Sequence, residues 1–115
     1  MKHLEGKVAV VTGASRGIGR AISVGLAQQG ADLVLAARTI PDLEVTRDAI
    51  VRYGVTAEIV QTDVTNEREI LDLFHTIVKR FGRLDVLVNN AGVFVNEPID
   101  EMSTATWDWV INIEL

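Results

Sequence analysis

The sequence predicts a doubly wound α/β fold, in which helices cover both faces of a parallel sheet. Apolar runs of strand length alternate with longer helix-like segments along the chain, which is the pattern of repeated β-α-β units. The strand candidates are nearly continuous apolar runs, as expected when both faces of a sheet are buried. At 115 residues, the chain is long enough for a single domain with its own hydrophobic core.

The elements alternate regularly. Strands are expected at residues 8–11, 33–37, 57–61 and 84–88, and helices at residues 18–29, 41–53 and 66–81. A further helix is expected to begin near Ser103. Strands joined by helices in this way predict a parallel sheet.

The segment 66–81 shows the clearest helical periodicity. Its stripe of apolar residues consists of Ile70, Phe74, Ile77, Val78 and Phe81. Thr65 or Asn66 is the expected N-cap, and the pairing of Asn66 with Glu69 predicts a loose capping box. We therefore expect an amphipathic helix that buries this stripe.

The segment 41–53 has a weaker helical pattern. Its start is indicated by Thr39 and Pro41, because proline is favoured in the first turn of a helix. Its end is indicated by Gly54, a residue type that commonly follows a helix.

Three spaced glycines follow the first expected strand. Gly13, Gly17 and Gly19 lie between a buried strand and the start of a helix. Glycine suits a tight strand-to-helix turn, and it lets the backbone approach a phosphate closely. The N–H groups and the positive dipole end of the helix then favour an anion. Spaced glycines alone are also common in ordinary turns, but this context favours a dinucleotide site.

Two motifs in this order resemble the short-chain dehydrogenase/reductase family. They are Thr12-Gly13-x-x-x-Gly17-x-Gly19 and Asn89-Asn90-Ala91-Gly92. The likeness covers nearly the whole chain and includes Asp63-Val64 after the third expected strand. It implies a Rossmann-type sheet with the strand order 3-2-1-4, truncated here after the fourth strand. It also implies hydride transfer between NADP(H) and an alcohol or carbonyl substrate.

The resemblance also implies a set of cofactor-binding residues. It places Gly13, Ser15, Arg16, Gly17, Ile18 and Gly19 around the pyrophosphate, Asp63 and Val64 at the adenine, and Asn90, Ala91 and Gly92 at the ribose. A second interpretation stays open for Asn89 and Asn90. They could form a turn that only stabilises the central strand, since asparagine favours turns.

The end of the second strand bears on the choice of cofactor. A carboxylate there would bind the ribose hydroxyl of NAD, but Ala37 occupies that position and Arg38 follows it. Asp32 cannot replace the carboxylate because it lies at the opposite end of the strand. Arg16 offers a second phosphate contact. We therefore expect NADP(H) to be favoured over NAD(H), the alternative being that both arginines are merely solvated.

The sequence contains no catalytic pair of the resembled family. There, a serine and a Tyr-x-x-x-Lys pair follow later in the chain, and the tyrosine is the general acid/base. Tyr53 is the only tyrosine, and we expect it to pack at the sheet end away from the cofactor. His3 and His75 are expected at the surface, and Glu114 stands where the family has an asparagine. We assign no catalytic residue and expect these 115 residues alone to be inactive.

The composition of the chain limits the classes of partner that the sequence predicts. The net charge of −5 comes from interspersed charges, which argues against nucleic acid and anionic membranes as partners. The absence of cysteine excludes disulfides and thiolate metal sites, and we assign no metal ligand. No apolar run reaches the roughly 20 residues that span a bilayer. A soluble, cytoplasmic protein is expected.

These observations predict one NAD(P)-binding domain spanning residues 1–115, incomplete at its carboxyl end. The resemblance implies a homo-oligomer for full-length members, and a small-molecule substrate only if the remaining half is supplied. Two alternatives stay open. The chain could be a non-catalytic dinucleotide-binding module, or a non-functional fragment whose fourth strand leaves an apolar edge.

Overall fold

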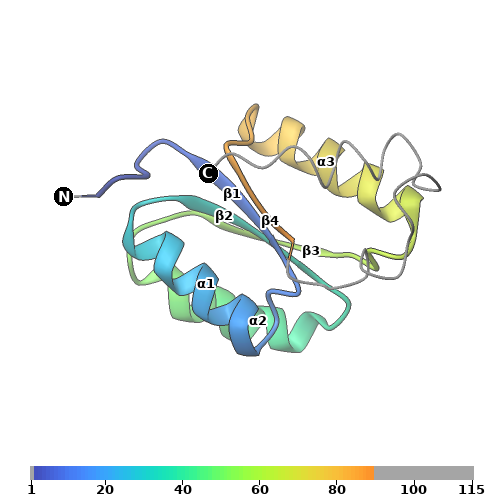
Figure 1. Ribbon diagram of the computed structural model, residues 1–115, viewed down its shortest axis with the longest axis horizontal. Coiled ribbons are helices and arrows are strands. Elements are labelled where there is room, and N and C mark those ends of the chain that lie inside the picture. The colour runs from blue at the N-terminus through green and yellow to red at the C-terminus, as the bar shows by residue number, and fades with distance from the viewer. Residues whose placement is uncertain (1, 90–115) are drawn as a thin grey trace.

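The computed structural model describes residues 2–89, which form four strands and three helices (Figure 1). In chain order these are β1 (Val8–Thr12), α1 (Gly17–Gln28), β2 (Asp32–Ala37), α2 (Ile40–Val51), β3 (Ala57–Gln61), α3 (Glu67–Phe81) and β4 (Val86–Asn89). The expected alternation is confirmed over these residues, with small shifts at the element ends. The helix expected near Ser103 lies outside the described residues.

The four strands form one parallel sheet in the order β3-β2-β1-β4. This confirms the doubly wound α/β fold and the predicted strand order. In the register of the sheet, Val10 of β1 pairs with Val34 of β2 and with Leu87 of β4. Because all four strands run in the same direction, their carboxyl ends meet at one edge.

The sheet separates two apolar layers. Helices α1 and α2 cover one face and α3 covers the other (Figure 1). In the central strand, Ala9 and Val11 join the layer of α1 and α2, whereas Val10 joins the layer of α3. All five residues of β1 are buried, which explains its continuous apolar sequence.

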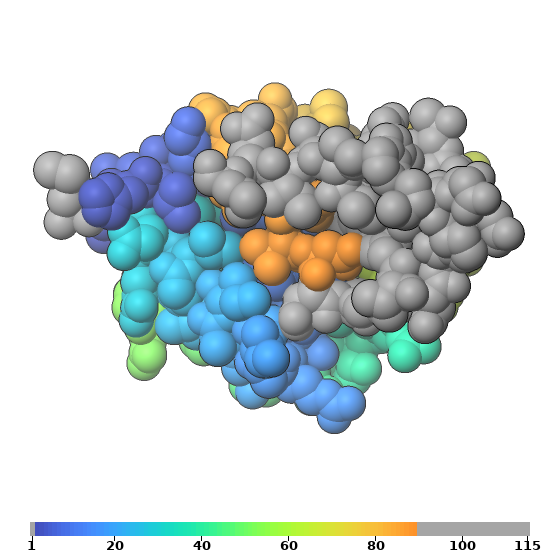
Figure 2. Space-filling model, viewed as in Figure 1, coloured from blue at the N-terminus to red at the C-terminus, as the bar shows by residue number. Residues whose placement is uncertain are grey.

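Strand β4 is less covered than β1. Only Leu87 of its four residues is buried. In the space-filling view, its orange residues reach the surface beside α1 (Figure 2). Among the described residues, β4 pairs only with β1.

Both ends of α3 are fixed by local sequence. The Asn66 side chain accepts hydrogen bonds from the N–H groups of Arg68 and Glu69, at 3.0 and 3.3 Å, which confirms the N-cap. The capping box is wrong in its second half. The Glu69 carboxylate accepts from the Asp63 N–H at 3.1 Å, because the N–H of Asn66 already donates to the Asp63 carbonyl at 2.9 Å.

The buried face of α3 differs from the predicted stripe at one position. Ile70, Leu73 and Ile77 are buried, and Phe74 and Phe81 pack partly against them. The prediction for Val78 is wrong, since its side chain is 66% exposed. Successive residues are about 100° apart around a helix, so Val78 lies about 140° from Leu73, beyond the contact with the sheet.

No helix within residues 2–89 combines the length and the apolar character needed to cross a membrane.

Candidate functional site

A cavity of about 500 Å³ lies beyond the carboxyl ends of β1, β2 and β3, and we call it the carboxyl-end cavity. Its lining residues are Gly13, Ser15, Arg16, Ala37, Arg38, Thr39, Asp42, Thr62, Asp63, Val64 and Thr65. Ligands of open α/β sheets bind at this edge, outside the strands. The described residues therefore form a cavity where the fold predicts a ligand.

The structure brings six of the predicted cofactor residues together around this cavity. They are Gly13, Ser15, Arg16, Arg38, Asp63 and Val64. Three others do not line it: Gly17 is exposed, Ile18 is 71% exposed, and Gly19 is buried in α1. The remaining three, Asn90, Ala91 and Gly92, lie outside the described residues.

The loop between β1 and α1 depends on glycine at two positions. Gly13 and Gly17 have φ angles of 65° and 61°, in the left-handed region that other residues rarely adopt. A Cβ added to Gly17 would meet nothing within 4 Å, so the backbone angle, not crowding, requires glycine there.

The start of α1 is suited to an anion. Its N-cap, Arg16, has an extended backbone and makes no side-chain cap, and the first turn holds no acidic residue. The helix dipole and the first N–H groups therefore remain uncompensated by a local carboxylate. A phosphate group has the charge that this helix end favours.

Charges of both signs lie around the carboxyl-end cavity. Arg16 and Arg38 bring two positive charges, and Asp42 and Asp63 bring two carboxylates. The Asp63 carboxylate accepts from the Thr65 hydroxyl at 2.6 Å and from the Thr65 N–H at 2.9 Å. These bonds, with a smaller contribution from Arg38, lower the pKa of Asp63 below its ordinary value.

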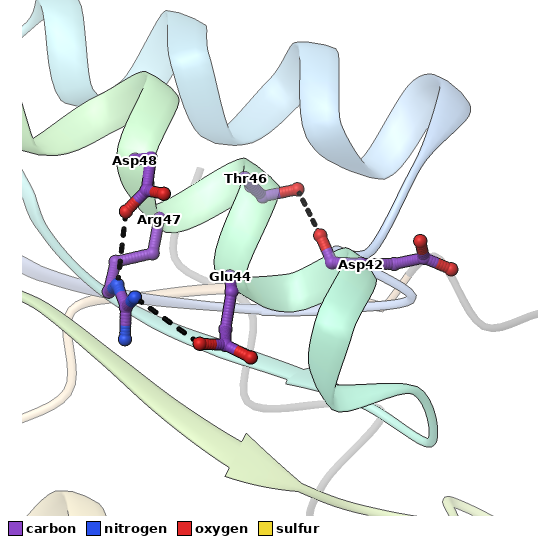
Figure 3. Close-up of polar contacts among 5 residues, drawn as sticks. All are labelled: Asp42, Glu44, Thr46, Arg47 and Asp48. Carbon is purple, nitrogen blue, oxygen red and sulfur yellow. Dashed lines mark hydrogen bonds and ion pairs between the residues drawn. The ribbon is translucent and has the colours of Figure 1, made fainter.

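Asp42 is a cavity residue that sequence reasoning missed. It lies in the first turn of α2, where a carboxylate is favoured by the helix dipole. Figure 3 shows its side chain pointing away from Glu44 and Arg47, which pair with each other at 3.6 Å. Its position in the first turn of the helix that follows β2 is the signal that could have identified it.

A partly buried chain of hydrogen bonds connects the loop of residues 13–16, which we call the glycine loop, to α2. The sequence did not predict it. The Arg20 Nε donates to the Thr46 hydroxyl at 2.9 Å, and that hydroxyl donates to the Ala14 carbonyl at 2.8 Å. The Arg20 Nη2 also donates to the carbonyls of Ser15 and Asp42. Thr46 is fully buried, so its hydroxyl acts inside the protein.

Tyr53 lies remote from the carboxyl-end cavity, as predicted. It follows α2 and precedes β3, at the amino end of the sheet, and packs partly against the layer of α1 and α2. Hydrogen bonds from Gln28 and Arg52 to its hydroxyl lower its pKa. His3 and His75 are exposed, as expected.

Asn89 is the last residue of β4, so the predicted motif begins inside the strand. Its side-chain oxygen accepts from the Thr12 hydroxyl at 3.1 Å. Thr12 is the last residue of the neighbouring β1. This contact joins the ends of two strands and agrees with the strand-stabilising interpretation of Asn89.

Comparisons with known sequences place residues 7–115 within the profile of the short chain dehydrogenase family. The chain is 36% identical over 115 residues to a CLA biosynthesis dehydrogenase/reductase of Lactiplantibacillus plantarum, covering 100% of this chain and 40% of that protein. It is 40% identical over 114 residues to the hydroxynaphthalene reductase-like protein Arp2 of Metarhizium guizhouense, covering 97% of this chain and 42% of that protein. The chain thus spans less than half the length of these relatives.

Solved structures show the same fold with either dinucleotide. L-sorbose reductase from Gluconobacter frateurii, complexed with NADPH and L-sorbose, is 38% identical with a TM-score of 0.76, over 94% of this chain and 41% of that one. A metagenomic short-chain oxidoreductase in complex with NADP is 44% identical with a TM-score of 0.75, over 92% and 48%. An NAD⁺-bound xylitol dehydrogenase is 33% identical with a TM-score of 0.77, over 87% and 41%.

Proposed function

The chain belongs to the short-chain dehydrogenase family, and we propose that its carboxyl-end cavity binds NADP(H) for hydride transfer to or from an alcohol or carbonyl carbon. The cofactor, when bound, would supply the hydride in the reduction and accept it in the oxidation. The residues of this chain hold the dinucleotide: the glycine loop and the start of α1 on the phosphates, and Asp63 and Val64 at the adenine. Asn90, Ala91 and Gly92 complete the proposed site on the ribose side.

The observation that carries this proposal is the pair of arginines on the carboxyl-end cavity. Arg16 comes from the glycine loop and Arg38 follows β2, and both line the same space. Ala37, at the end of β2, brings no carboxylate to repel a phosphate. Guanidinium groups bind phosphate by charge-assisted hydrogen bonds, so this arrangement favours the 2′-phosphate of NADP(H).

A second candidate is an NAD(H)-dependent enzyme, and Asp42 is the observation that favours it. Its carboxylate also lines the carboxyl-end cavity, and it could accept a hydrogen bond from a ribose hydroxyl. The similar xylitol dehydrogenase is NAD⁺-bound. The two candidates therefore differ in the contact at the ribose: Arg38 would bind the 2′-phosphate of NADP(H), whereas Asp42 would bind a ribose hydroxyl of NAD(H).

Calorimetric titration of the chain with NADP⁺ and NAD⁺ at one fixed salt concentration separates the candidates. We expect tighter binding of NADP⁺, and we expect Arg38→Gln to weaken NADP⁺ binding about tenfold while NAD⁺ changes less than about twofold. Arg80→Gln is the matched control, because Arg80 is an exposed arginine near the end of α3, where it pairs with Glu58, and it does not line the cavity. Equal or tighter binding of NAD⁺, lost in Asp42→Asn, would favour the second candidate.

We propose further that a polypeptide of these 115 residues does not turn over substrate. Its one tyrosine hydroxyl contacts Gln28 and Arg52 at the amino end of the sheet, away from any bound nicotinamide. Assays with alcohol and carbonyl panels and NADP(H) should give only background rates. Reproducible turnover that Gly13→Asp abolishes would overturn this proposal.

A further inference from the structure

We infer that Thr46 and Arg20 are positioning residues, which turn two N–H groups of the glycine loop toward a phosphate in the carboxyl-end cavity. This inference rests on the proposed function, since it assumes that the cavity holds a phosphate-bearing dinucleotide. The two groups are the N–H of Ser15 and the N–H of Arg16. Neither Thr46 nor Arg20 lines the cavity itself.

The contacts form an ordered chain of donors. Arg20 has no acceptor atom, so its Nε–H must donate to the Thr46 oxygen at 2.9 Å. The single Thr46 proton is then best placed on its nearest acceptor, the Ala14 carbonyl at 2.8 Å, because the carbonyls of Ser15 and Asp42 are more distant, at 3.4 and 3.5 Å. Consecutive bonds of this kind polarise and strengthen one another.

These bonds fix the direction of two peptide groups. The carbonyls of Ala14 and Ser15 both accept bonds from side chains packed behind the loop. In a trans peptide, the following N–H points opposite to the carbonyl, and no peptide among the described residues is cis. The Ser15 N–H therefore points away from Thr46, and the Arg16 N–H points away from the Arg20 Nη2; both residues line the cavity.

The same residues also hold two sides of the cavity together. The Arg20 Nη2 donates to the Ser15 carbonyl of the glycine loop and to the Asp42 carbonyl of α2, the latter at 3.3 Å. Both Ser15 and Asp42 line the cavity. The loop is tied to β2 as well, since the Ala14 N–H donates to the Ala36 carbonyl at 3.3 Å. Arg20 thus fixes the spacing between the glycine loop and the first turn of α2.

Two substitutions at Thr46 separate positioning from packing. Thr46→Val keeps the volume and removes the hydroxyl, whereas Thr46→Ser keeps the hydroxyl and removes a methyl group. We expect Thr46→Val to weaken binding of NADP⁺ and NAD⁺ by about tenfold, and Thr46→Ser to stay within about threefold of wild type. The control is Thr76→Val, because the Thr76 hydroxyl bonds only the Asp72 carbonyl within α3, at 3.0 Å.

A spectroscopic readout tests the N–H groups directly. In ¹⁵N-labelled wild-type chain, inorganic phosphate should shift the amide protons of Ser15 and Arg16 downfield, and the shift should shrink in Thr46→Val but persist in Thr46→Ser and Thr76→Val. If Thr46→Val does not fold, Arg20→Met is used instead, since it removes the donor behind Thr46.

The outcomes distinguish this inference from the proposed function. If both dinucleotides bind wild type and Thr46→Val equally well, the inference is wrong and the function stands. If neither dinucleotide binds but phosphate shifts both amides in a hydroxyl-dependent way, the dinucleotide function is wrong, and Thr46 and Arg20 position the loop for the phosphate of another ligand. Affinities that follow the melting temperatures of the variants, with Thr46→Ser the weakest, would show a packing role only.

Discussion

Helices α2 and α3 lie on opposite faces of the sheet and are specified in different ways. In α3, the Asn66 side chain caps the start, and Gly82 ends the helix in the left-handed conformation. Acidic residues lie in its first turn and basic residues in its last turn, as the helix dipole favours. In α2, the N-cap Thr39 makes no side-chain bond and the last turn has no basic residue. Yet α2 buries Leu43, Thr46 and Ile50 as completely as α3 buries its own stripe.

The difference indicates that α3 is set by its local sequence and α2 by tertiary contacts. The buried face of α2 includes a hydroxyl, which is costly to bury unless it is hydrogen-bonded. Thr46 meets that condition by contacting the glycine loop and Arg20. The helix with the weaker sequence signal is therefore connected to the carboxyl-end cavity through a buried side chain.

The largest predicted effect concerns the apolar face of α3. Leu73 is fully buried, so Leu73→Ala should lower the free energy of unfolding by about 2–5 kcal/mol. Val78→Ala, five residues further along the same helix, should change it by less than about 0.5 kcal/mol. Urea denaturation measures both. Equal losses for the two variants would mean that the face of α3 is not the one described.

The second largest predicted effect is the difference in unfolding free energy between substitutions at the two N-caps, Asn66 of α3 and Thr39 of α2. Asn66→Ala removes a cap that accepts two N–H bonds and should cost about 1 kcal/mol of unfolding free energy. Thr39→Ala removes no such bond and should cost only a few tenths. Chemical denaturation of both variants provides the comparison. A larger loss for Thr39→Ala would contradict the local specification of α3.

The smallest predicted effect is the pH dependence of the stability that Asp85 contributes, in the connection between α3 and β4. Two hydrogen bonds from Arg83, at 2.7 and 2.8 Å, and one from the Val8 N–H, at 2.9 Å, lower the pKa of Asp85. A lowered folded pKa adds stability above the unfolded value of about 3.9. That stability is lost as pH falls through the folded value.

Asp85→Asn should therefore be less stable than wild type at pH 7, and the difference should narrow as pH falls below about 4. Denaturation midpoints at pH 7, 5 and 3 measure it. Asp48→Asn is the control, since Asp48 is an exposed residue of α2 that only pairs with Arg47. A gap for Asp85→Asn that stays constant with pH would contradict the role of its charge.

Much of the fold and part of the site could be predicted because their signals are local. Continuous apolar runs indicate the strands. Because the carboxyl ends of parallel strands meet at one edge of the sheet, Arg38 after β2 is expected close to the glycine loop after β1. Thr46 could not be predicted, since a lone threonine in a helix gives no sign of a partner 32 residues earlier, the Ala14 carbonyl. Val78 was placed wrongly because periodicity indicates a stripe but not its width.

We propose above all that the carboxyl-end cavity receives the dinucleotide. Titration of ¹⁵N-labelled chain with NADP⁺, followed by amide chemical shifts, tests it most directly. We predict saturable shifts at Ser15, Arg16, Arg38 and Thr65, with the amides of α3 from Leu73 onward unchanged. Saturable shifts confined to α3, or none at the glycine loop at millimolar NADP⁺, would contradict the claim.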